Sequence, residues 1–148
     1  MKLHIRRFQR TDLDSLHELL SDEEVMRYIE LPFTMEQTRA FLEEAGLPDS
    51  PLIYAVADES GAFIGYVIYH DYEKDSKEIG WILKRAAWRN GYAETLTKML
   101  MDWARLENKA VVIECAPEQG ISKHIAEKFG FSYIGQRDGC DVYKLENL

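Results

Sequence analysis

One glycine lies between a pattern typical of a strand and a pattern typical of a helix. Residues 78–84 (EIGWILK) are largely apolar, residues 85–93 (RAAWRNGYA) are basic and aromatic, and residues 94–103 (ETLTKMLMDW) place apolar residues at helical spacing. A glycine at an abrupt strand-to-helix turn lets backbone N–H groups converge on an anion at the helix N-terminus. Gly91 therefore predicts an anion site, and phosphate is the anion that we expect.

The charge distribution sets this stretch apart from the rest of the chain. The net charge is −8, from 18 Lys and Arg against 26 Asp and Glu. Residues 1–76 carry 7 basic and 16 acidic side chains (−9), residues 77–109 carry 7 and 4 (+3), and residues 110–148 carry 4 and 6 (−2). Nucleic acid needs an extended positive surface, so we expect no nucleic-acid partner. The pattern favours an anionic cofactor at the basic segment, residues 77–109, and a cationic substrate elsewhere. Charged helix surface that is only solvated also produces such an asymmetry of charge.

Composition predicts a single globular domain, residues 1–148, without a metal site. A chain of 148 residues that is 46% hydrophobic can build one core. Cys115 and Cys140 have neither CxxC spacing nor nearby paired histidines, so we expect two reduced thiols. No apolar run approaches the ~20 residues that span a bilayer, and the N-terminus lacks the apolar segment of a signal peptide. We therefore expect a cytoplasmic protein with no membrane partner.

The elements that precede the basic stretch follow from periodicity and capping residues. The pattern predicts a strand over 2–8, a helix capped by Thr11, a short helix capped by Asp22, and a helix over 35–45 with a Thr34/Gln37 capping box. It then predicts strands over 52–57 and 63–69 around the turn 58–61, and a polar loop over 71–77.

The elements after the basic stretch complete a mixed α/β fold. Residues 110–115 form an apolar strand, and a right-handed crossover through the helix makes this strand parallel to 78–84. A last helix carries Ile121, Ile125 and Phe129 on its apolar face, stops at Gly130, and precedes a hairpin around residues 138–139. We expect a mostly antiparallel sheet with one central parallel strand pair, flanked by helices.

Four segments together resemble a known family. EIGWIL, WRNGYA at the head of a helix, APEQGIS and EKFGF occur in this order. This succession is similar to the motifs of the GCN5-related N-acetyltransferases, and within them to the RimJ/RimL-like branch of ribosomal-protein N-terminal alanine acetyltransferases. The resemblance runs from IRRFQRTDLD to the final hairpin. It implies the acyl-CoA N-acyltransferase fold, with acetyl-CoA as co-substrate and no metal.

The resemblance implies which residues bind the cofactor. The family's phosphate motif, Q/R-x-x-G-x-G/A, falls on Trp88, Arg89, Asn90, Gly91, Tyr92 and Ala93. Trp88 replaces the usual Gln or Arg, but the motif acts chiefly through main-chain N–H groups. The pantetheine arm is expected to pair with Ile82 and Leu83. Lys84, Arg85 and Arg89 flank the glycine turn and are expected to meet phosphate oxygens, unless each is only a solubilising surface charge.

Transfer to an amine also needs proton carriers. Glu78 resembles the Glu of the family's E-I-G-Y/W segment and is our candidate base, the alternative being a solvent-facing carboxylate. Many relatives use a tyrosine as general acid, and that position holds Ala126 here. The branch has N-x-x-S instead, which falls on Gln119 and Ser122. Ser122 is expected to donate to the CoA thiolate, unless it only caps its helix, and Gln119 to contact the pantetheine.

The acceptor is expected near the acidic first helical region. Tyr28, Glu30, Phe33 and Trp81 are candidates for a groove that binds an amine, although aromatic residues at periodic positions are usually core. The acceptor that we expect is a protein or peptide N-terminal α-amine. The alternatives are a small-molecule acetyltransferase for an antibiotic or polyamine, and a non-catalytic acyl-CoA-binding module. The aromatic content is compatible with a homodimer.

Overall fold

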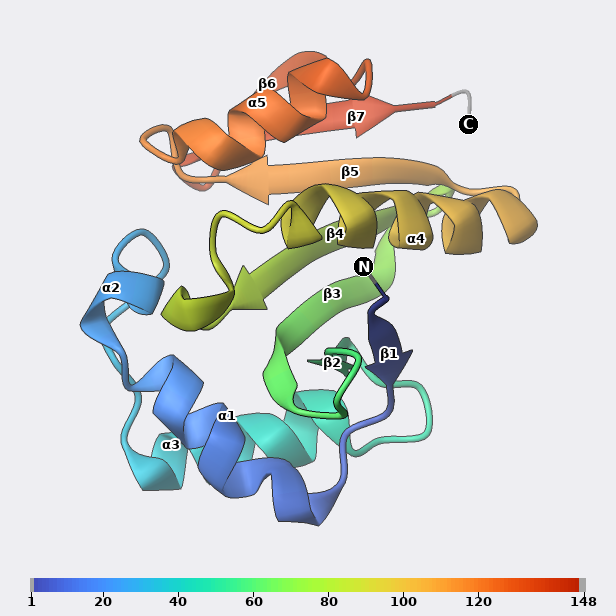
Figure 1. Ribbon diagram of the computed structural model, residues 1–148. Coiled ribbons are helices and arrows are strands. Elements are labelled where there is room, and N and C mark those ends of the chain that lie inside the picture. The colour runs from blue at the N-terminus through green and yellow to red at the C-terminus, as the bar shows by residue number, and fades with distance from the viewer. Residues whose placement is uncertain (1, 147–148) are drawn as a thin grey trace. The chain divides into compact units, whose positions relative to one another are not determined.

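Seven strands form one sheet within residues 2–146, the part of the chain that this computed structural model describes (Figure 1). The order in the sheet is β1-β2-β3-β4-β5-β7-β6. The strands are β1 (His4–Arg6), β2 (Ile53–Ala57), β3 (Phe63–Glu73), β4 (Ser76–Leu83), β5 (Ala110–Cys115), β6 (Ser132–Arg137) and β7 (Cys140–Leu145). The α-helices are α1 (Leu13–Leu20), α2 (Glu23–Met26), α3 (Met35–Phe41), α4 (Tyr92–Leu106) and α5 (Gly120–Lys128). The predicted mixed α/β class is confirmed.

The chain divides into two compact units. The first holds the described residues through 68 together with 81–92, and the second holds 69–80 and the described residues from 93 onward. Each unit is described separately below.

The first unit builds its core between strands and helices of the N-terminal half. β2 pairs antiparallel with both β1 and β3, in a register that sets Ala55 opposite Arg6 and Tyr66. α1 and α3 lie side by side in Figure 1. Leu16, Leu20 and Val56 are fully buried. Burial of such aliphatic side chains is the main stabilising contribution.

Local capping explains where the helices of this unit begin. Thr34 and Gln37 form the predicted capping box, with the Thr34 N–H 2.9 Å from Gln37 Oε1 and the Gln37 N–H 3.1 Å from Thr34 Oγ1. Asp22 caps α2 as predicted. The prediction of Thr11 as a cap was wrong. A 3-10 turn over Arg10–Asp12 precedes α1, so Asp12 stands at the N-cap position; its carboxylate makes no cap hydrogen bond to α1 but accepts the Gln9 N–H and the Arg6 guanidinium.

The second unit contains the parallel strand pair. Ser76, Lys77 and Glu78 of β4 stand opposite Ala110, Val111 and Val112 of β5, which confirms the predicted crossover. β5 also pairs antiparallel with β7, and β7 with β6. The hairpin turn has positive φ at Asp138 and Gly139, as its sequence predicts.

Two predictions for this unit were wrong. The expected loop over 71–77 is strand on both sides of a two-residue turn, because the Lys77 ammonium is satisfied by Asp71 at 2.8 Å and by Glu107 at 3.6 Å. Ile121 is 73% exposed, since the buried face of α5 is formed by Ile125 and Ala126. No helix in the part of the chain described is long and apolar enough to cross a membrane.

Candidate active site

An elbow of unusual backbone, residues 84–92, precedes α4. Residues Arg85–Ala87 form a single 3-10 turn, and Arg89 and Gly91 then have φ angles of 65° and 75°. Left-handed residues gather successive backbone N–H groups into a concavity that binds anions. α4 follows directly, and the start of a 15-residue helix carries a partial positive charge. The elbow therefore fits a phosphate group, and Gly91 stands where the sequence places it.

Two side chains of the predicted cofactor set brace this elbow. The Trp88 indole N–H donates to the Leu83 carbonyl at 2.8 Å. The Asn90 amide donates to the carbonyls of Ala87 and Trp88, each at 3.1 Å. Arg85, in contrast, is committed to Asp22 of the α2 cap, with Nε 2.7 Å from Oδ2. These contacts hold the backbone that would bind the ligand.

The strand that leads into the elbow lies very close to β3. A side chain at Gly65 would place its Cβ 2.1 Å from the Ile82 carbonyl oxygen and 2.9 Å from Leu83 Cα. The Lys84 N–H then donates to the Ile64 carbonyl at 2.9 Å. Gly65 therefore shapes β4 at Ile82 and Leu83, where the pantetheine is expected. A lone glycine inside a strand pattern signals such close approach, so Gly65 could have been predicted to have this role.

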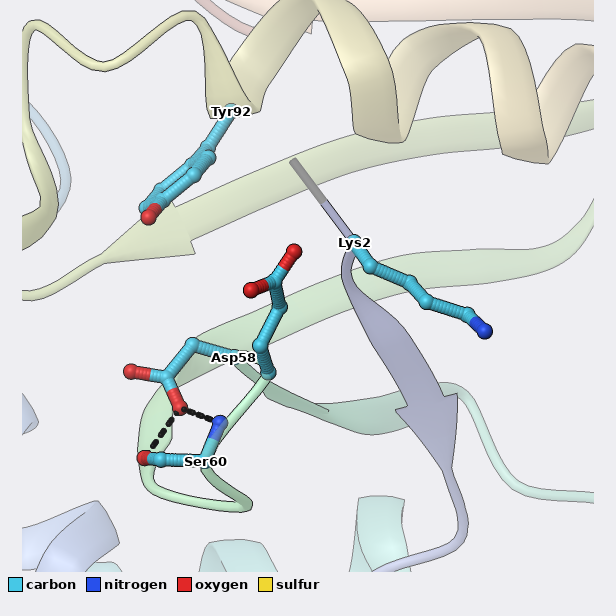
Figure 2. Close-up of a pocket in the computed structure, with 5 residues that line it drawn as sticks. Lys2, Asp58, Ser60 and Tyr92 are labelled. Atoms are coloured by element: carbon cyan, nitrogen blue, oxygen red, sulfur yellow. Dashed lines mark hydrogen bonds between the residues drawn. The ribbon is translucent and has the colours of Figure 1, made fainter.

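A hollow of about 460 Å³ lies beside the start of α4 (Figure 2). Its lining consists of Lys2, Asp58, Glu59, Ser60 and Tyr92. The Asp58 carboxylate accepts hydrogen bonds from the Ser60 N–H and hydroxyl, as Figure 2 shows, and so closes the β2–β3 turn. Two carboxylates in the lining disfavour a phosphate here. This hollow is therefore not the phosphate site expected from the sequence.

Glu78 lies at the end of the parallel register, opposite Val112. Its Oε1 is 3.8 Å from His70 Nε2, and the two side chains are 22% and 26% exposed. Burial raises the pKa of Glu78, the His70 charge opposes this, and Glu114 adds to it. A half-buried carboxyl group with a raised pKa has the properties of a general base.

The strand register explains why charged side chains gather around Glu78. Side chains two residues apart on a strand share a face, so Glu114 follows Val112 on the face that Glu78 uses. Cys140 precedes Val142, the residue opposite Glu114, on the same face of β7. Burial raises the pKa of Cys140, and Glu114 and Glu78 add to this effect. The thiol is therefore kept protonated beside the carboxylates.

The start of α5 holds the other predicted catalytic residue. The Gln119 amide oxygen accepts the Ala116 N–H at 2.9 Å, which fixes the loop after β5. Ser122 is half-buried in the first turn of α5, where Gln119 and not Ser122 occupies the N-cap position. The expectation that Ser122 merely caps its helix gains no support from these contacts.

The candidate acceptor residues differ in environment. Tyr28 is 39% exposed and lies under the Arg27 guanidinium, 5.2 Å from its ring centre. Glu30 is exposed, and it adds to burial in raising the pKa of Tyr66. Phe33 is partly buried; its ring packs edge-on against Phe41 at 5.9 Å, and both rings pack against the core cluster. Trp81 is half-buried on β4.

The predicted residues are divided between the two units. The first unit contains Tyr28, Glu30, Phe33, Trp81, Ile82, Leu83, Lys84, Trp88, Arg89, Asn90, Gly91 and Tyr92. The second contains Glu78, Ala93, Gln119 and Ser122. Ala93 accepts the Thr97 hydroxyl within α4 at 2.7 Å. His70 was not among the predicted site residues because the strand was expected to end at Tyr69, whereas β3 continues to Glu73. No group of three or more metal-ligating side chains is placed to hold a metal among the residues described.

Comparison with known families matches most of the chain. The model for the acetyltransferase (GNAT) domain matches residues 2–132. An uncharacterized N-acetyltransferase of Bacillus subtilis, YnaD, is 26% identical over 143 residues, which are 94% of this chain and 84% of the relative.

Solved structures share the fold. An acetyltransferase of the GNAT family from Bacillus anthracis superposes with a TM-score of 0.83 at 27% identity, covering 97% of this chain and 93% of the other. Spermidine N-acetyltransferase from Vibrio cholerae, solved with CoA and spermine, gives a TM-score of 0.79 at 22% identity over 96% and 92% of the two chains. The predicted acyl-CoA N-acyltransferase fold is confirmed.

Proposed function

This chain belongs to the acetyltransferase (GNAT) family and is an acetyl-CoA-dependent acetyltransferase, and we propose that its acceptor is a protein or peptide N-terminal α-amine. The RimJ/RimL-like motifs in the sequence support this acceptor class. The observation that carries the assignment of roles is the half-buried Glu78 at the end of the parallel register.

In our proposal the elbow holds the pyrophosphate of acetyl-CoA. The left-handed Arg89 and Gly91, the helix start at Tyr92 and Ala93, and the braces from Trp88 and Asn90 support this placement. Lys84 adds positive charge at the elbow. The pantetheine arm lies along Ile82 and Leu83, where the close approach of Gly65 shapes the strand, and Gln119 orders the loop after β5.

Transfer of the acetyl group then requires a neutral amine and a protonated leaving group. Glu78 accepts a proton from the incoming ammonium group, directly or through water, and the free amine attacks the thioester carbonyl. Ser122 donates a hydrogen bond to the departing CoA thiolate. The thiolate of a thiol with a pKa of ~8.5 is a good leaving group, so this hydrogen bond contributes less to the rate than the base does.

Acceptor binding uses the acidic surface of the first unit. Tyr28, Glu30 and Trp81 would contact the cationic acceptor, whereas the packing of Phe33 gives it mainly a core role. A small polyamine is the second candidate, favoured by the carboxylates of Glu78 and Glu114 on one face of the sheet. The fold is shared with a spermidine N-acetyltransferase, which also motivates this test.

We further propose that both units work as one acetyltransferase domain in the cytoplasm. The family match runs through residues of both units, from 2 to 132. Cys115 and Cys140 are free thiols, as is usual in a reducing compartment.

A panel of peptides and amines, assayed for CoA release, tests these assignments. We expect turnover with α-amino peptides and a loss of about 10²-fold or more in kcat for Glu78→Gln, with CoA affinity unchanged. Ser122→Ala should lower kcat by a smaller factor. Turnover with polyamines alone would select the second candidate. Binding of CoA without turnover on any acceptor would identify an acyl-CoA-binding module.

A further inference from the structure

His70 stands beside the proposed base in a defined orientation. Its Nδ1 lies 2.9 Å from the carbonyl oxygen of Asp71. A carbonyl can only accept a hydrogen bond, so Nδ1 carries the proton and Nε2 is the nitrogen that faces Glu78. With Nδ1–H donated to this carbonyl, a neutral ring presents its Nε2 lone pair to the Glu78 carboxylate, and a proton added at Nε2 would point at the same carboxylate.

Two acceptors that face each other at 3.8 Å are stabilised by one proton between them. Such contacts are often long without substrate and tighten when it binds. Burial of both side chains to about three quarters limits solvation by bulk water. From this geometry we infer that His70 and Glu78 hold one proton as a pair, and that His70 is a positioning residue which extends the basicity of Glu78.

This inference rests on the proposed role of Glu78 as base. The acceptor arrives as R–NH3+ and gives one proton to the unprotonated pair, where it lies between Glu78 and His70. The free amine nitrogen forms its bond to the thioester carbonyl carbon as the carbon–sulfur bond breaks. The second amine proton neutralises the CoA thiolate, and the proton on the pair then leaves to solvent.

Other titratable groups around the pair come from three strands. Glu114 of β5 and Cys140 of β7 face Glu78, and Asp71 of β3 lies next to His70. The Asp71 carboxylate is paired with Lys77 at 2.8 Å. Glu114 disfavours a second negative charge nearby, which promotes uptake of a proton by the pair.

The pH dependence of kcat/KM separates a shared proton from a simple charge effect. In the wild type, the active form is the pair without its shared proton. The fall of kcat/KM on the acid side of the pH profile, the acid limb, therefore reports the pKa at which the pair takes up that proton. In His70→Gln the limb reports Glu78 alone, and we expect it to move to lower pH by about one unit, with kcat/KM at neutral pH about tenfold lower. His124→Gln, on the exposed face of α5, should leave the profile unchanged.

A charge effect alone predicts the opposite direction. The His70 charge lowers the pKa of Glu78, so its removal would then move the limb to higher pH. An acid limb that moves to higher pH in His70→Gln, or that does not move, overturns the inference. An inactive wild type on every acceptor would instead contradict the proposed function, and a readout without turnover is therefore needed.

NMR of the Glu78 carboxyl carbon supplies that readout. A shared proton makes this carbon titrate in two steps in the wild type and in one step in His70→Gln. The same single step in both proteins would overturn the inference whether or not the enzyme turns over. Unchanged stabilisation by CoA in His70→Gln would show that the variant is folded.

Discussion

Glu78 is a carboxyl group that the folded chain makes harder to ionise. Its pKa is raised above the ordinary value of 4.5, first by burial and then by Glu114. The folded state therefore holds this proton more tightly than the unfolded state does. The resulting stabilisation is complete below pH 4.5 and is lost as pH rises through the folded pKa. The ionised base is thus a cost to stability at neutral pH.

Glu78→Gln should remove that cost. As pH rises from 4 to 8, we expect the free energy of unfolding of Glu78→Gln to increase relative to that of the wild type. The reason is that only the wild type must ionise a buried carboxyl group. Urea denaturation at several pH values measures the difference. Glu36→Gln, an exposed carboxylate of α3, serves as control. If the difference in free energy of unfolding between Glu78→Gln and the wild type does not change with pH, burial is not the cause of the raised pKa of Glu78.

The family resemblance made Glu78 a candidate base, but nothing in the sequence singled out His70 beside it. The resemblance selected Glu78 for its place at the start of EIGWIL, and the register then placed it at the end of the parallel pairing. His70 was not selected because polar residues after it suggested a loop. Ion pairs between strands, such as Lys77 with Asp71, allow those polar residues to lie in strands, and short-range patterns do not report them.

At the scale of elements, close packing between β3 and β4 positions the strand that we propose binds the pantetheine. Gly65 has φ of 152° and lies against the backbone at Ile82 and Leu83, so its lack of a side chain is a steric requirement. The Asp22–Arg85 ion pair joins the α2 cap to the elbow. Together these contacts fix the strand and the turn between which acetyl-CoA would lie.

Gly65→Ala should therefore destabilise the protein by roughly 3 kcal/mol, since the new Cβ overlaps a carbonyl oxygen. We also expect weaker CoA binding, because Ile82 and Leu83 must shift. Gly61→Ala is the matched control: its φ is +88°, but a Cβ there meets no atom within 4 Å. Equal losses in the two variants, measured by denaturant unfolding, would show that backbone strain alone accounts for the effect.

Most elements could be predicted from local signals, and the failures share a physical cause. The Thr34/Gln37 box, the Asp22 cap and the Asp138–Gly139 turn are each encoded within a few residues. The crossover follows from the succession of strand, helix and strand patterns. Thr11, Ile121 and the 71–77 segment depend on contacts from elsewhere in the chain. The left-handed backbone at Arg89 also has no local signal, because non-glycine residues rarely adopt it.

At the scale of the whole molecule, charge distribution bears on the acceptor. The chain carries a net charge of −8, and its basic excess lies around the elbow. An acidic surface attracts a cationic acceptor over a distance that salt shortens. The same field would oppose the approach of CoA anywhere except at the elbow.

Raising ionic strength should therefore increase KM for a cationic acceptor several-fold between ~50 and ~500 mM salt, with less change in kcat. Steady-state kinetics with a peptide series of increasing positive charge measures this. The effect should grow with acceptor charge. A KM that is independent of salt for the most cationic peptide would contradict an acidic acceptor surface.

Binding of acetyl-CoA at the elbow is the central claim, and thermal unfolding tests it most directly. At a ligand concentration of about 100 times Kd, we expect ~2.7 kcal/mol of stabilisation, a rise in Tm of roughly 5–10 °C. Gly91→Glu should abolish the rise, because a side chain and a negative charge would enter the phosphate position. Gly130→Glu, at the left-handed end of α5, controls for backbone strain. No rise in the wild type, or an equal rise in Gly91→Glu, would contradict the claim.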